Sequence, residues 1–145
     1  MIRKTAIALA VALSFAGPAA YGQAAHDHGH AASEAKLVLN QGKKWPTDAP
    51  LREGMENIRS ALGSHMKYEA LATKVSTEVA GIVQNCKLEP EADAQLHLVI
   101  ADIMGGVEAL EGKVKGETRR AGAEKIARAL NAYGEHFDHA GWKRL

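Results

Sequence analysis

The sequence has a single cysteine, little net charge and no run of alternating apolar and polar residues long enough for a β-strand. Cys86 cannot form a disulfide within the chain, so in an oxidising compartment it must be buried, bound to a metal or paired with another chain. Lys and Arg are scattered, and the formal net charge is +1. This balance does not indicate the basic surface patch that binds nucleic acid or an anionic membrane, so neither is expected as a partner.

Motifs of common enzymes and haem proteins are also missing. Covalent haem attachment through Cys-x-x-Cys-His needs a second cysteine, and the Glu-x-x-His pairs of ferritin-like bundles do not occur. The chain likewise has no nucleophile elbow, phosphate-binding loop or His-Glu-x-x-His motif. These absences predict a protein that is not an enzyme and carries no covalent haem.

The first 22 residues have the pattern of a bacterial export signal. A basic start at Arg3 and Lys4 precedes an apolar run over 5–16 and a small-x-small cleavage site at 20–22. The apolar run is shorter than the ~20 residues that span a bilayer. We therefore predict a signal peptide over these residues, a periplasmic mature chain that begins at Gln23, and no stable membrane span after cleavage. An uncleaved signal would instead form a short anchor.

The mature chain has the length of one domain and is nearly neutral. Without the two basic residues of the signal, the 18 Lys and Arg fall to 16 against 17 Asp and Glu, a net charge of −1. Its 123 residues are enough to bury a sizeable core. We divide it into an extended N-terminal arm over 23–46, which contains histidines and Trp45, and a helical region over 47–145. The Gly and Pro of GKKWP at 42–46 exclude a long helix in the arm.

Four stretches after the arm have the apolar spacing of amphipathic helices. The first has Thr47 or Asp48 as its N-cap and Pro50 in its first turn. The predicted helices cover about 50–62, 68–85, 90–111 and 117–137. Short links between consecutive helices favour antiparallel neighbours, so we predict an all-α fold, an up-down-up-down antiparallel four-helix bundle with an extended N-terminal arm.

In such a bundle, one end collects several side chains that bind soft metals. At a rise of 1.5 Å per residue, these side chains fall within roughly 10 Å of one another along the axis of the bundle. A thioether, a thiol and imidazoles suit copper(I), or zinc if the thioether is left out. Asp93 lies one turn before the histidine of the third helix and could orient it. The candidate ligands are Met55, Cys86, His97, His136 and His139.

Each candidate also has a purely structural explanation. Met55 on a core stripe fills gaps, and a free cysteine such as Cys86 is among the most buried residue types. A histidine beside a stripe, such as His97, is often half-exposed and bonded locally. The dipole at a helix C-terminus favours imidazolium, which accounts for His136 and His139 without a metal.

Six glycines fall within the predicted helices, and each lowers the stability of its helix by on the order of 1 kcal/mol relative to Ala. Either they let two helices approach closely, or they leave room for a ligand or a second copy of the chain. The six are Gly54, Gly81, Gly105, Gly106, Gly122 and Gly134.

Three histidines follow the export signal in QAAHDHGH at 23–30. Neutral imidazoles are common metal ligands, but a short segment of this kind is not expected to form a specific high-affinity site. His26, His28 and His30 either load metal ions towards the bundle or only solubilise the N-terminus.

The sequence resembles two groups of small exported bacterial proteins. The outline of a bundle after an export signal resembles cytochromes b562 and c′, although the covalent haem motif is absent; non-covalent haem would use Met55 and His136. A closer resemblance, to little-characterised DnrO-like proteins, rests on GKKWPTDAPLREGMENIR at 42–59, NCKLEPEADAQLHLVIADIMGGVEALEG at 85–112 and ALNAYGEHFDHAGW at 129–142. It implies a small exported four-helix-bundle protein but no particular activity, and the link GSHMKYEA is shorter than is usual in that group.

The function expected from these observations is binding of a soft metal of the copper type, without catalysis, for buffering or delivery in the periplasm. The first alternative is a metal-free interaction or stress-accessory module that forms a homodimer or binds an envelope protein. The second is an electron carrier with non-covalent haem. The candidate cofactors are therefore copper or zinc, and the principal partner is a metal ion.

Overall fold

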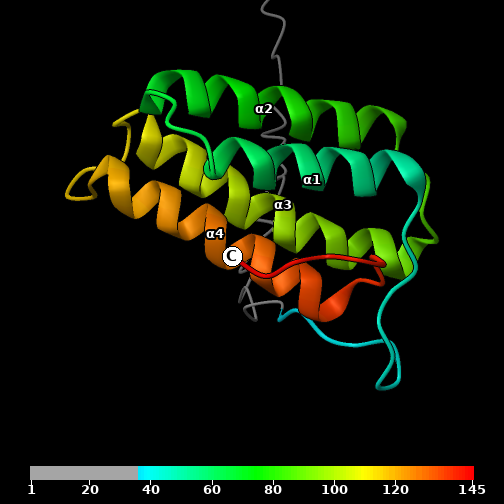
Figure 1. Ribbon diagram of the computed structural model, residues 1–145. Coiled ribbons are helices and arrows are strands. Elements are labelled where there is room, and N and C mark those ends of the chain that lie inside the picture. The colour runs from blue at the N-terminus through cyan, green and yellow to red at the C-terminus, as the bar shows by residue number, and fades with distance from the viewer. Residues whose placement is uncertain (1–35) are drawn as a thin grey trace, which may run out of the picture. The chain divides into compact units, whose positions relative to one another are not determined.

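The computed structural model describes residues 36–145, and within this range it contains four α-helices and no β-strands. They are α1 (Ala49–Leu62), α2 (Tyr68–Asn85), α3 (Pro90–Leu110) and α4 (Arg119–His136) (Figure 1). The predicted all-helical character is confirmed for this part of the chain. The predicted signal peptide and the three histidines His26, His28 and His30 lie outside the described residues. None of the four helices combines the length and apolarity needed to cross a membrane.

Capping side chains mark the starts of α1 and α4, and a proline marks the start of α3. Asp48, one of the two predicted N-caps, accepts a hydrogen bond from the backbone N–H of Leu51 at 3.0 Å, and Pro50 lies in the first turn. Thr118 caps α4 in the same way, accepting from Ala121 N–H at 3.1 Å. Pro90 starts α3, with acidic residues in its first turn where the helix dipole favours them.

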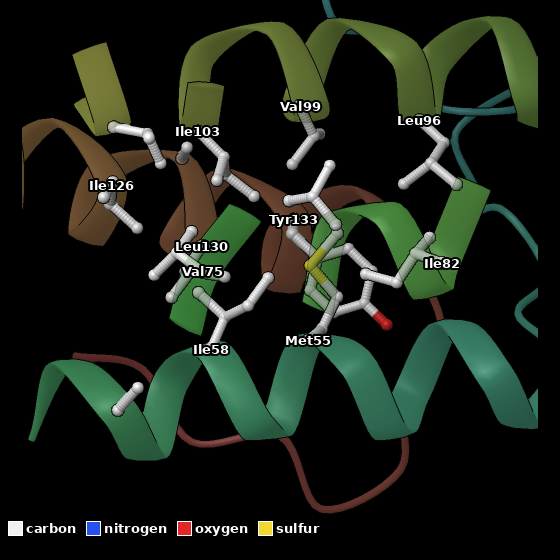
Figure 2. Packing of buried hydrophobic residues seen from close by; sticks show 14 of the residues in the cluster. Met55, Ile58, Val75, Ile82, Leu96, Val99, Ile103, Ile126, Leu130 and Tyr133 are labelled. Atoms are coloured by element: carbon white, nitrogen blue, oxygen red, sulfur yellow. The ribbon is translucent and has the colours of Figure 1, made fainter. Parts of the chain in front are cut away.

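One face of each helix contributes to a common core (Figure 2). Tyr133 and Phe137 are its largest fully buried side chains. Apolar side chains point into this core from all four helices; those labelled in the figure are Met55, Ile58, Val75, Ile82, Leu96, Val99, Ile103, Ile126, Leu130 and Tyr133. Burying a side chain of this kind contributes roughly 1.5–3 kcal/mol, so the core is the main source of stability.

Glycines set the closest helix contacts. At Gly54 of α1, a Cβ atom would overlap the side chain of Ile82 on α2. Between α3 and α4, a Cβ at Gly106 would lie 2.8 Å from the carbonyl oxygen of Gly122, and one at Gly122 would lie 2.7 Å from that of Gly106. These glycines therefore serve close helix approach, the first of the two predicted reasons. Gly81 is different, since a Cβ there would meet nothing within 4 Å.

The segment before α1 is held against the helices. Trp45 is half-buried on the core and exchanges backbone hydrogen bonds with the end of α4: its N–H donates to His136 O, and its carbonyl accepts from Asp138 N–H, both at 2.8 Å. The Trp45 indole N–H donates to Val38 O at 2.6 Å, and Val38 N–H donates to Gln95 Oε1 on α3 at 2.8 Å.

Two glycine-to-alanine substitutions are expected to change stability in opposite directions. In Gly106→Ala the new Cβ is forced against backbone of α4, which should lower the free energy of unfolding by about 1–3 kcal/mol. In Gly81→Ala the new Cβ meets open space, so the better helix propensity of Ala should raise it by about 0.5–1 kcal/mol. Urea denaturation measures both, and equal effects of the two substitutions would contradict the described packing.

Candidate functional site

Two of the predicted ligands, Cys86 and His97, line the same surface hollow between α2 and α3. The hollow has a volume of about 190 Å³, and Asp93 and Val83 also line it. Cys86 is the first residue after α2, and His97 lies two turns into α3. The end of one helix and the start of the next therefore place a thiol and an imidazole on one small surface.

His97 is oriented by the preceding turn of its own helix. Its Nδ1 lies 2.9 Å from the carbonyl oxygen of Asp93 and 3.3 Å from Oδ2 of the Asp93 carboxylate. The predicted contact between Asp93 and His97 is therefore present. Because only a protonated Nδ1 can donate to the carbonyl, this geometry favours the tautomer in which Nε2 carries the free lone pair. The exposed imidazole thus offers Nε2 as a ligand atom.

Cys86 is half-buried and free, with a protonated thiol. Burial raises the pKa of the thiol to about 12, and a hydrogen bond to the Asp48 carboxylate adds to this shift, since that bond is made by the S–H form. At neutral pH the group is therefore a poor nucleophile. A metal ion must displace its proton in order to bind sulfur.

Asp48 is the residue at this site that sequence reasoning assigned only to capping. One of its carboxylate oxygens accepts from Leu51 N–H, and the other accepts from Lys87 N–H at 2.6 Å. Burial alone would raise the pKa of this carboxyl, but the backbone hydrogen bonds from Lys87 and Leu51 and the bond from the Cys86 thiol lower it overall. No spacing in the sequence signals a contact across the 39 residues that separate Asp48 from Lys87.

The remaining predicted ligands lie elsewhere. Met55 is fully buried among core side chains, and its thioether fills space between the helices (Figure 2). His136 at the end of α4 is half-buried, and its Nδ1 lies 2.8 Å from Ala132 O. Neither Met55 nor His136 lines the hollow of Cys86 and His97. Within residues 36–145, no group of three or more His, Cys, Asp or Glu side chains is arranged to hold a metal ion.

His139 belongs to an aromatic cluster beyond α4. Its Nδ1 lies 3.0 Å from the hydroxyl of Tyr133, and its ring centroid lies 5.0 Å from that of Trp142. Burial lowers the pKa of His139, partly opposed by the nearby Glu56 carboxylate. Trp142 packs on Gly134, where a Cβ would overlap the indole. The last glycine of the predicted set therefore makes room for a side chain of the same chain.

The pKa of Cys86 predicts slow and pH-dependent alkylation. At pH 8 the folded protein should react with iodoacetamide at least about tenfold more slowly than the urea-unfolded chain, and its rate should keep rising above pH 10, because the thiolate is the reactive form. Asp48→Asn removes the negative charge that raises the pKa of the thiol, so it should speed alkylation. The asparagine keeps a side-chain oxygen that can cap α1. Thr118→Asn, a matched change at the cap of α4, should leave the rate unchanged. Equal rates for the wild type and Asp48→Asn would contradict the proposed control of Cys86 by Asp48.

The hollow thus contains a thiol held in its protonated form, an oriented imidazole and a carboxylate. Comparisons of the chain with protein-family models, with curated proteins and with solved structures found no match. The resemblance to DnrO-like proteins therefore stays a prediction, and the functional argument rests on the residues and contacts described above.

Proposed function

We propose that the chain is an exported, non-enzymatic helical protein that binds a soft metal ion, with copper(I) preferred, for buffering or delivery in the periplasm. The observation that supports this is the shared hollow of Cys86 and His97. In this proposal these two residues are the ligands, while Met55, His136 and His139 have the structural roles described above. The histidines His26, His28 and His30 act as a separate, weaker site.

The pair of ligands suits copper(I) better than zinc. Thiolate is a soft ligand that selects copper(I), and this ion accepts two ligands in a linear arrangement, so one sulfur and one nitrogen suffice. Zinc prefers four ligands, and it would have to add Asp93 and water to complete its coordination. The contact of Asp93 with Nδ1 of His97 fixes the direction in which Nε2 points.

Metal capture at this site releases a proton. The Cys86 sulfur loses its proton to solvent as the copper–sulfur bond forms, and the Asp48 carboxylate loses the hydrogen bond that it accepts from the thiol. The protonated thiol therefore lowers the apparent affinity at neutral pH. This property suits an ion that is passed on rather than kept.

The proposal includes an up-down-up-down antiparallel arrangement of the helices, with an extended arm ahead of α1. It is supported by the short links between consecutive helices and by the packing of α1 on α2, α2 on α3, and α3 on α4. It is also supported by the hydrogen bonds of Trp45 to the end of α4, which hold the segment before α1 in place.

Copper(I) competition titrations on the chain from Gln23 test the proposal. Cys86→Ser should weaken binding by at least about a hundredfold, because the thiolate provides the stronger bond to a soft ion, and His97→Ala should weaken it by about tenfold or more. His136→Ala is the matched control, since this histidine does not line the hollow, and it should have no effect.

A variant with His26→Asn, His28→Asn and His30→Asn separates the two sites. It should keep the tighter site and lose only weaker binding. Loss of all copper binding in this triple variant would contradict the proposed site at Cys86 and His97. A folded, metal-free protein that binds no copper would instead favour the alternative of an interaction module.

A further inference from the structure

A second surface hollow lies between α1 and α2 and is independent of Cys86 and His97. Its volume is about 350 Å³, in the range of sites that hold small ligands. Polar side chains from both helices line it: Glu53 and Asn57 from α1, and Glu78 and Asn85 from α2. Gly81 of α2 lies among them.

Gly81 has no packing partner that requires a glycine. Gly54, Gly106, Gly122 and Gly134 each lie where a Cβ would overlap a neighbour, whereas a Cβ at Gly81 would meet nothing within 4 Å. A glycine inside a helix still costs on the order of 1 kcal/mol relative to Ala. Since the glycine is not needed for packing between these helices, its effect is to keep the hollow open.

The polar groups of the hollow present acceptors. The side-chain NH₂ of Asn57 donates to Glu78 Oε2 at 3.0 Å, and that of Asn85 donates to the carbonyl of Gly81 at 2.8 Å. Each amide oxygen is therefore available as an acceptor, beside the one N–H of each amide that these two bonds do not use. Together with the two carboxylates, these oxygens form a surface that accepts hydrogen bonds.

The hollow also carries an excess of negative charge. Glu53 forms no ion pair within residues 36–145, whereas Glu78 pairs with Lys74 at 2.5 Å. Hydrogen bonds from Lys74 and Asn57 lower the pKa of Glu78, so its carboxylate stays ionised. Of the two carboxylates that line the hollow, Glu78 is paired with Lys74 and Glu53 keeps a negative charge without an ion-pair partner in the described residues.

We propose that the hollow between α1 and α2 binds an organic cation with several N–H donors, that is, a guanidinium or a primary ammonium group. Such a ligand donates to the acceptor oxygens of the two asparagines and pairs with Glu53, while Gly81 lets it approach the backbone of α2. An anion or an apolar ligand would leave these acceptors unpaired.

Two sources share this chemistry, a free polyamine and the side chain of an arginine. Spermidine and N-acetyl-arginine amide are the probes that represent them, with magnesium chloride as a control for simple charge attraction. Each is titrated into the ¹⁵N-labelled chain from Gln23, and the amide signals of Gly81, Asn57 and Asn85 are followed. The probe that binds more tightly identifies the source.

Two variants and two matched controls connect binding with the hollow. Gly81→Leu fills the space and should abolish the shifts, whereas Ala80→Leu makes a similar change at the exposed neighbouring position and should keep them. Glu53→Gln should weaken binding by about tenfold through loss of a charge-assisted hydrogen bond. Glu108→Gln removes an exposed charge from α3 and should leave the affinity unchanged. Circular dichroism confirms that each variant is helical.

The proposal predicts saturable shifts at the three amides with at least one organic cation and weaker ones with magnesium. It is overturned if neither organic cation shifts these signals at millimolar concentration. It is equally overturned if Gly81→Leu binds as well as Ala80→Leu, or if magnesium binds as tightly as the organic cations.

Discussion

The Asp48 carboxylate links the start of α1 to the residues just after α2, where Cys86 lies. One oxygen caps α1 through Leu51 N–H, the other holds Lys87 N–H just after α2, and the thiol of Cys86 donates to the same group. A single charged side chain therefore joins the start of α1 to the end of α2, and it adds to the effect of burial that keeps the Cys86 thiol protonated. Hydrogen bonds to charged groups contribute about 1.5–3 kcal/mol each, a large share of the stability of a small domain.

The helices could be predicted from the sequence because local rules determine them. Apolar residues recur with helical spacing along α1 to α4, and Asp48, Pro50 and Pro90 mark helix starts by hydrogen bonding and fixed backbone geometry. The core position of Met55 followed from the same periodicity. The contact between Asp93 and His97 was accessible for the same reason, since residues four apart on a helix are neighbours.

The detail of the candidate site depends on contacts that sequence spacing does not encode. Cys86 and His97 share a hollow because the link after α2 turns back towards α3, whereas His139 is drawn to Tyr133 and Trp142 by packing beyond α4. Gly81 and Gly106 look alike in the sequence, yet one faces open space and the other faces backbone. The helical pattern gave no means of telling them apart. Helix α2 consequently borders both hollows, one with soft ligands and one with acceptor oxygens.

X-ray absorption at the copper edge tests the central claim most directly, that Cys86 and His97 together hold a soft metal ion. The sample is the chain from Gln23, with His26, His28 and His30 replaced by Asn and one equivalent of copper(I) bound. The account predicts one sulfur and one imidazole nitrogen around copper, with the sulfur lost in Cys86→Ser. A spectrum with only nitrogen and oxygen neighbours, or one unchanged by Cys86→Ser, would contradict it.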